Sequence, residues 1–166
     1  EGTFDVDSGT MDALFRRFNV PEDAYRRLWI YRPVDSFQLQ EQLRELAEDV
    51  DVVIIDSLVA LHRAEYRGRQ MLAARQQSIL YQLNLLSRFA RLGKLAIVTD
   101  QVMDVPAFFT AKRPAGGNVL LHSVQAIFMM DRPNKSKMEG VMWPLDVPGM
   151  SPQTEIHYEI GEDGLH

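Results

Sequence analysis

The run Val52-Val53-Ile54-Ile55-Asp56-Ser57 decides the fold class. Four apolar residues without polar alternation are typical of a strand that is covered on both faces, as in a parallel sheet. Residues 95–99 repeat this pattern after a long amphipathic stretch, which predicts a helix over residues 70–92 that stops at Gly93. The order strand, helix, strand predicts right-handed crossovers and an α/β fold, with helices on both faces of a mostly parallel sheet.

The residues before this run extend the same pattern. Asp35 precedes an amphipathic stretch and predicts a capped helix, and apolar positions after Ser8 and Gly9 predict a shorter helix near the start. Residues 28–31, Leu-Trp-Ile-Tyr, are stopped by Pro33 and predict a further buried strand.

The last third of the chain changes character. Residues 124–130, 138–145 and 154–160 read as extended segments, and the stretches between them carry turn residues without a helical pattern. This predicts a C-terminal β-meander. Since no internal repeat or linker is visible, we expect residues 1–166 to form a single domain.

Composition excludes several classes of protein. The 166 residues are 46% hydrophobic and include no cysteine, so a disordered chain, a disulfide framework and a cysteine-based zinc site are excluded. No apolar run approaches the roughly 18 residues of a membrane-spanning helix. We therefore expect an intracellular protein with no membrane partner.

The net charge of −5 is unevenly distributed. Acidic side chains outnumber basic ones in residues 1–51 and 131–166, whereas basic side chains are in excess in residues 52–130. A basic centre between acidic flanks could form one positive face that meets a polyanion. The alternative is that these basic side chains are simply solvated on helix surfaces.

Two strand ends carry candidate chemistry. Because ligands of open α/β sheets bind beyond the carboxyl ends of the strands, Asp56, with Ser57 beside it, could hold Mg²⁺ next to a nucleotide phosphate. Gln101, after the second strand, could position a water or sense a γ-phosphate. The alternatives are that Asp56 only caps the following turn and that Gln101 is an ordinary turn residue.

Two segments after these strands are rich in cations. Residues 61–69 contain His62, Arg63, Arg67 and Arg69 around a glycine, and such a loop could grip phosphates. The second segment, residues 102–118, reads as a long mobile loop that could stack on bases while its backbone amides meet phosphates. Its candidate residues are Phe108, Phe109, Lys112, Arg113, Gly116, Gly117 and Asn118. The alternative is a surface loop whose phenylalanines pack on the domain.

Six motifs in order along nearly the whole chain resemble the RecA/RadA-type recombinase ATPase family, in particular its archaeal and eukaryotic RadA branch. The motifs are Glu1-Gly2-Thr3-Phe4, Asp56-Ser57, Tyr66-Arg67-Gly68-Arg69 with Ala74-Arg75-Gln76, Thr99-Asp100-Gln101-Val102, Pro114-Ala115-Gly116-Gly117-Asn118 with His122, and Asp146-Val147-Pro148 with Pro152 and Glu155.

The resemblance implies a role for each matched residue. Glu1 would activate the hydrolytic water, Asp56 would help to hold Mg²⁺, and Gln101 would couple the γ-phosphate to the second DNA loop. His122 would sense the γ-phosphate, and the turn with Asp146 and Pro148 would cap a neighbouring protomer's nucleotide. Contacts with DNA or support of the DNA loops would come from Arg69, Arg75, Gly116, Gly117 and Asn118.

The sequence also departs from the family pattern. The phosphate-binding motif G-x-x-x-x-G-K-[ST] is absent, Asp100 stands where the family usually has Asn, and the second loop is shorter than usual. We therefore expect the C-terminal part of an ATPase core, truncated upstream of Glu1, that alone binds ATP feebly and does not hydrolyse it.

The implied function of the parent protein is ATP- and Mg²⁺-dependent DNA strand exchange in homologous recombination and repair. Its partners would be single- and double-stranded DNA and further copies of itself in a filament or ring, in the cytoplasm and nucleoid or in a nucleus. The alternative is a non-catalytic RadA-like paralogue that binds DNA or a recombinase as a mediator. A helicase-type or clock-type motor fits the G-G-N and D-x-P motifs less well.

Overall fold

The computed structural model describes residues 9–46, 48–105, 111–134, 136–161 and 164–166. The chain divides into two compact units, Arg32–Val124 and the combination of Glu1–Tyr31 with Gln125–His166, and each is described by itself. The predicted site residues Glu1, Phe108 and Phe109 lie outside the described residues.

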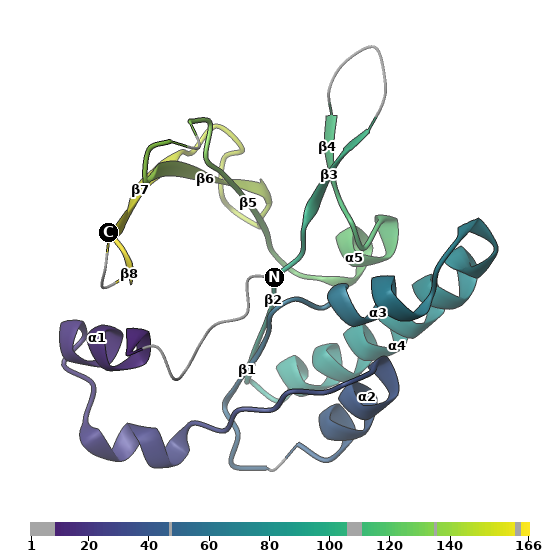
Figure 1. Ribbon diagram of the computed structural model, residues 1–166, viewed down its shortest axis with the longest axis horizontal. Coiled ribbons are helices and arrows are strands. Elements are labelled where there is room, and N and C mark those ends of the chain that lie inside the picture. Colours follow the sequence, from purple (N-terminus) through teal and green to yellow (C-terminus); the bar gives the residue numbers. More distant parts are fainter. Residues whose placement is uncertain (1–8, 47, 106–110, 135, 162–163) are drawn as a thin grey trace. The chain divides into compact units, whose positions relative to one another are not determined.

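The unit Arg32–Val124 contains the parallel strands predicted from the sequence (Figure 1). Strand β1 pairs in parallel with β2, with Val52 opposite Leu95 and Ile55 opposite Val98. The elements of this unit are α2 (Ser36–Arg44), β1 (Val52–Ile55), α3 (Ala60–Glu65), the 3-10 turn η3 (Arg69–Met71), α4 (Leu72–Arg91), β2 (Leu95–Val98), β3 (Val102–Val105), β4 (Ala111–Pro114) and α5 (Asn118–Ser123).

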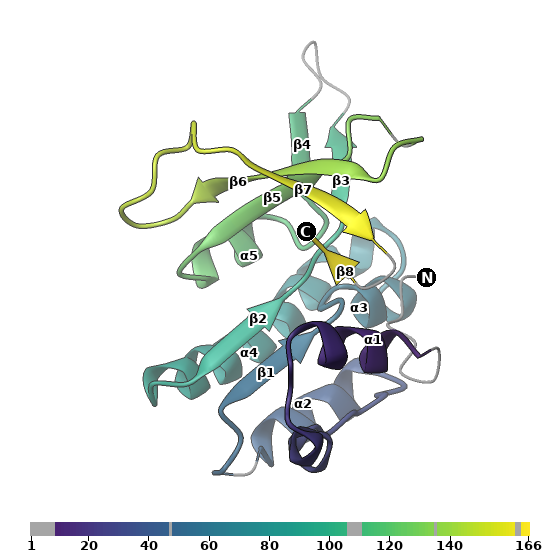
Figure 2. The same cartoon turned by 90° about the vertical axis from the view of Figure 1, so that its left-hand side faces the viewer.

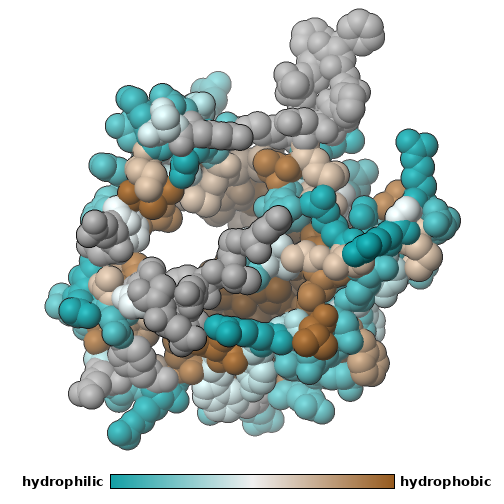
Figure 3. Space-filling model, viewed as in Figure 1, coloured by the Kyte–Doolittle hydropathy of each residue, from teal (hydrophilic) through white to brown (hydrophobic). Residues whose placement is uncertain are grey.

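Helices α2 and α4 lie on the same side of the β1–β2 pair (Figures 1 and 2). Buried Leu39 and Leu43 of α2 and Leu86 of α4 pack against the strand residues that point towards them. The predicted cap is confirmed, because Asp35 accepts a hydrogen bond from the Gln38 N–H at 2.7 Å. The strand residues of the opposite face, Val52, Ile54, Leu95 and Ile97, are 42–65% exposed. Figure 3 shows, in brown, the apolar residues that are visible on the face drawn.

A second cluster of buried residues lies beyond the carboxyl ends of β1 and β2. It joins the segment after β1 to α4 and to the segment that leads into α5. Its members are Leu58, Val59, Ile79, Leu83, Ala115 and Leu120. This cluster fixes the segment after β1 and the segment that leads into α5, and the sequence predicts the site at the strand ends next to them.

The segment after β2 is more regular than predicted. The sequence indicates a loop over residues 102–118, but β3 and β4 form an antiparallel hairpin, with Val102 opposite Pro114. The Ala115 N–H donates to the Gln101 carbonyl at 2.7 Å and closes the base of the hairpin. The loop prediction failed because Lys, Arg and Pro carry weak strand propensity, whereas cross-strand pairing is a non-local property.

The predicted strand over residues 28–31 is wrong. No strand forms there, and the four side chains are 41–58% exposed. Aromatic and branched residues favour extended backbone, but a strand also needs a neighbour for its ladder hydrogen bonds. None of the described strands pairs with this run.

The other unit contains the predicted meander. Strands β5, β6, β7 and β8 are neighbours in that order and all pair antiparallel. Its elements are α1 (Thr10–Arg17), the 3-10 helix η2 (Glu22–Arg27), β5 (Ile127–Asp131), β6 (Glu139–Asp146), β7 (Ile156–Gly161) and β8 (Gly164–Leu165). The N-cap of α1 is Gly9, which makes no side-chain cap.

A close approach between β6 and β7 requires a glycine. Tyr158 lies opposite Gly140, and its hydroxyl donates to the Asp131 carbonyl at 3.3 Å. A Cβ atom at position 140 would lie 2.2 Å from the Tyr158 ring, which is far inside van der Waals contact. The tyrosine ring therefore takes the space that a side chain on β6 would otherwise fill.

None of the described helices combines the length and the apolar character that crossing a membrane requires.

Candidate functional site

The carboxyl end of β1 presents Asp56 to solvent, as the sequence predicts. The Thr99 hydroxyl, at the end of β2, donates to Asp56 Oδ1 at 2.6 Å, while Ser57 is half-buried beside it. Carboxylate oxygen is the donor that Mg²⁺ prefers, and Mg²⁺ usually keeps several waters. The exposed, oriented carboxylate of Asp56 therefore fits a cation that is held partly by water and phosphate.

Three consecutive residues after β2 reach three different segments. Thr99 binds the residue that ends β1, Asp100 binds the backbone of Gly116, and Gln101 binds Arg63 of α3. The sequence spacing of these bonds is 43, 16 and 38 residues. The end of β2 is therefore the junction at which the predicted phosphate-facing residues meet both predicted DNA segments.

The first predicted DNA segment, residues 61–69, presents cations on α3 and the turn that follows. Arg63 Nη1 donates to Gln101 Oε1 at 2.7 Å, and Arg67 Nε donates to the Ala64 carbonyl at 2.9 Å. Arg69 is exposed on η3. Arg75 of α4 is half-buried, and its Nε is buried without a hydrogen-bond partner among the described residues. Arg75 is thus less open to solvent than Arg63, Arg67 and Arg69, and its charge acts on His62 of the same segment.

His62, in the same segment, does not join these cations. It is 0% exposed, its Nδ1 lies 3.0 Å from the Leu58 carbonyl, and its ring stacks on Tyr66. Burial lowers the pKa of His62; the Leu58 carbonyl and Glu65 oppose this shift and Arg75 adds to it. The imidazole is therefore a neutral core group, and the sequence could not distinguish it from a surface cation.

The second predicted DNA segment, residues 102–118, is held by side chains near its C-terminal end. Gly116 donates its N–H to Asp100 Oδ2 at 2.7 Å and accepts a hydrogen bond at its carbonyl from Gln76 Nε2 at 3.0 Å. Gly117 has a positive φ of 73°, and Asn118 begins α5. Lys112 and Arg113 of this segment lie in β4. His122, the predicted γ-phosphate sensor, is exposed on α5, after the segment.

Asp100 and Gln76 were not among the predicted site residues, although both lie next to one. Burial raises the pKa of the Asp100 carboxyl above its ordinary value; hydrogen bonds from the Gly116 and Gln101 N–H groups and the charge of Arg63 oppose the shift. The available signal was position, because Asp100 directly precedes Gln101 and Gln76 directly follows Arg75.

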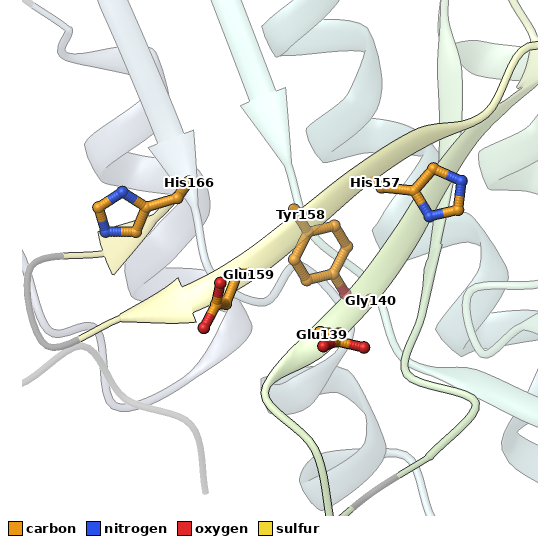
Figure 4. A pocket seen from close by; sticks show the side chains of 6 residues that line it. All are labelled: Glu139, Gly140, His157, Tyr158, Glu159 and His166. Carbon is orange, nitrogen blue, oxygen red and sulfur yellow. The ribbon is translucent and has the colours of Figure 1, made fainter.

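Asp146 and Pro148 belong to the other unit. Asp146 ends β6, and Pro148 lies in a turn that the Met150 N–H closes on the Val147 carbonyl at 3.1 Å. Both residues are exposed, so their side chains are available to a partner. A pocket in this unit is lined by Glu139, Gly140, His157, Tyr158, Glu159 and His166, none of which the sequence singled out (Figure 4).

Comparisons with known proteins bear on the family and the fold of this chain. Residues 3–166 match the Rad51 family. The chain is 35% identical to the meiotic recombination protein DLH1 of Candida albicans over 99% of its own length and 53% of the relative. It is 32% identical to the DMC1 homolog A of Oryza sativa subsp. indica over 85% of its own length and 42% of the relative. The chain thus spans about half the length of the curated relatives it matches.

A solved structure is similar to nearly the whole chain. The crystal structure of the RadB recombinase superposes with a TM-score of 0.75, covers 99% of this chain and 74% of its own, and is 22% identical. This likeness confirms the predicted α/β fold class with C-terminal strands. The family match also confirms the resemblance inferred from the six motifs, and the chain belongs to the Rad51 family.

Proposed function

We propose that this chain is the C-terminal part of the ATPase core of a DNA strand-exchange recombinase. The recombinase would act in homologous recombination and repair, in the compartment of the cell that holds the chromosomal DNA. One observation carries the proposal: Thr99, Asp100 and Gln101 tie the predicted Mg²⁺ residue Asp56 to both predicted DNA segments. The named functions of the relatives, meiotic recombination proteins, support it.

The parent protein would take ATP and Mg²⁺, with Asp56 facing the cation and Gln101 and His122 facing the γ-phosphate. When bound, these groups supply an electrophilic phosphoryl centre and charge neutralisation. Glu1 would act as the base for the attacking water, and Asp146 and Pro148 would cap the nucleotide of a neighbouring protomer. The present chain contains no G-x-x-x-x-G-K-[ST] motif to cradle phosphates, so we expect no ATP hydrolysis by it alone.

The Arg63–Gln101 hydrogen bond supports a coupling between the two sites. Both side chains are exposed, and each can exchange its present partner for a phosphate oxygen or a water. If Gln101 turns towards a nucleotide, Arg63 is released to bind a DNA phosphate. The DNA surface would otherwise consist of Arg67, Arg69, Phe108, Lys112, Arg113 and the segment Gly116-Gly117-Asn118, with Arg75 beneath it.

A salt series tests the DNA interface. Single-stranded DNA binding is measured by fluorescence anisotropy at several salt concentrations for the wild type, Arg69→Ala and the matched control Arg91→Ala. Arg91 is exposed at the far end of α4. We expect Arg69→Ala to weaken binding and to reduce the slope of log K against log salt by about 1, whereas Arg91→Ala leaves the slope unchanged. Equal slopes for all three proteins would contradict the proposal.

A non-catalytic mediator is the second candidate, and Asp100 favours it. This carboxylate adds a negative charge beside Gln101, where a γ-phosphate would have to approach. ATPase assays of the parent protein, with and without DNA, separate the two functions. The recombinase predicts DNA-stimulated turnover, and the mediator predicts DNA or recombinase binding that does not change with ATP. Turnover by the 166-residue chain alone would contradict our assignment of the chain as an incomplete core.

A further inference from the structure

The peptide group of Gly116 is held from both sides by side chains of other elements. Asp100 Oδ2, beyond β2, accepts its N–H at 2.7 Å, and Gln76 Nε2, on α4, donates to its carbonyl at 3.0 Å. These partners are 16 and 40 residues away along the chain. We call this arrangement of Asp100, Gln76 and Gly116 the Gly116 clamp.

A side chain at position 116 would be crowded by its neighbours. A Cβ atom there would lie 3.1 Å from both Asp100 Oδ2 and Leu120 Cδ1, and 3.2 Å from Val59 Cγ2. Leu120 and Val59 belong to the buried cluster beyond the strand ends, so they cannot withdraw freely. Because glycine has no side chain, the Asp100 carboxylate reaches this N–H without crowding.

Both oxygens of Asp100 are used. While Oδ2 accepts the Gly116 N–H, Oδ1 accepts the Gln101 N–H at 2.8 Å. Asparagine has one acceptor oxygen, and its amide group would face one of these donors with hydrogens. An aspartate is therefore the residue that satisfies both backbone donors at this position.

The bonds converge on the base of the β3–β4 hairpin. The Gln101 carbonyl accepts the Ala115 N–H at 2.7 Å, so the residues that enter and leave the hairpin are joined directly and through Asp100. We propose that Asp100 is a positioning residue which, with Gln76, fixes Gly116 so that the hairpin and the segment Gly116-Gly117-Asn118 are presented to a DNA backbone. This inference rests on the proposed DNA-binding function.

A positioning role and a simple charge effect of Asp100 predict opposite changes in DNA affinity when this residue is replaced. An aspartate near a DNA phosphate weakens binding by repulsion, so its removal should strengthen binding if charge alone matters. If Asp100 acts by holding Gly116, its removal should weaken binding although a negative charge is lost. The direction of the change therefore separates the two roles.

The test uses the full chain and two measurements. NMR-detected amide hydrogen exchange at Gly116 reports the clamp, and anisotropy with fluorescent single-stranded DNA at several salt concentrations reports binding. The variants are Asp100→Ala, Asp100→Asn and Gln76→Ala. The matched control is Asp51→Ala, which removes the same charge from an exposed position directly before β1.

We expect Asp100→Ala to speed Gly116 exchange at least about tenfold, as loss of a hydrogen bond to a charged group should. Its DNA affinity should fall about three- to tenfold with an unchanged salt slope, since Asp100 touches no phosphate. Asp100→Asn should retain part of both properties because it keeps one acceptor. Asp51→Ala should leave Gly116 exchange unchanged and DNA affinity equal to or slightly above the wild type.

Two results would overturn the inference: unchanged Gly116 exchange in Asp100→Ala, or a DNA affinity that rises as in Asp51→Ala. If Asp100→Ala does not fold, Gln76→Ala removes the opposite side of the clamp and must show the same two losses. If the wild type binds no DNA, the proposed function fails, and with it the role in DNA presentation, whereas the exchange rate of Gly116 still reports the clamp itself.

Discussion

Each of the two units of this chain is organised internally by a different kind of interaction. In the meander, each of β5 to β8 pairs with its neighbour in sequence, so backbone hydrogen bonds between successive strands define its structure. In the unit Arg32–Val124, side chains at the carboxyl ends of β1 and β2 bind segments up to 43 residues away. We infer that changes in the cores of both units affect stability, whereas changes at the strand ends mainly affect geometry and binding.

The largest effect is expected from the core beyond the strand ends. Ile79 of α4 is 0% exposed in the buried cluster, so Ile79→Ala should lower the free energy of unfolding by about 4 kcal/mol. The neighbouring Leu80 is 40% exposed, and Leu80→Ala should cost less than about 1.5 kcal/mol. Urea unfolding followed by circular dichroism measures both, and equal costs would show that this cluster is not a packed core.

A somewhat smaller effect is expected in the meander. Gly140→Ala places a methyl group against the Tyr158 ring and should cost about 2–3 kcal/mol. Tyr158→Ala should make room for that methyl group, so adding Gly140→Ala to it should cost little. Chemical denaturation of the two single variants and the double variant gives the coupling, and additive costs would contradict a steric origin.

His62 should make the stability of the Arg32–Val124 unit depend on pH. Because burial lowers its folded pKa below the ordinary 6.5, the unfolded chain binds a proton first as pH falls. Stability is then lost progressively from about pH 6.5 down to the folded pKa, and it recovers as pH rises. Comparing pH-dependent unfolding of the wild type with His62→Phe should show this component vanish; identical pH profiles would exclude His62 as its source.

The smallest effect on stability is expected at the strand ends. Thr99 and Asp56 are both exposed, so Thr99→Val should change the free energy of unfolding by only about 0.5 kcal/mol. The Asp56 carboxylate should nevertheless lose its fixed orientation, which side-chain carboxyl NMR shifts and couplings would report. A loss of stability as large as that of Ile79→Ala would remove the distinction between core and strand ends.

Features set by local sequence were predictable. The apolar runs of β1 and β2, the Asp35 cap and the order of the meander strands follow from residues that are neighbours in the chain. The position of Asp56 was predictable for the same reason, because a residue that follows an apolar strand of a parallel sheet lies at the carboxyl edge of that sheet.

Features that depend on distant partners were not predictable. Residues 28–31 have strand propensity but pair with none of the described strands, and the β3–β4 hairpin forms although its sequence is cationic. The Gly116 clamp depends on Asp100 and Gln76 meeting one peptide group across 16 and 40 residues. Neither residue has a local pattern that announces such a contact.

The half-open apolar face of β1 and β2 has a consequence for colloidal behaviour. Exposed sheet surfaces of this kind favour association between chains, and the net charge of −5 opposes it by mutual repulsion. Added salt screens that repulsion and also weakens contacts with nucleic acid. Light scattering should therefore rise over the same salt range in which DNA affinity falls. The salt concentration at which scattering begins to rise should mark the point above which the affinity measurement no longer reports on a monomer.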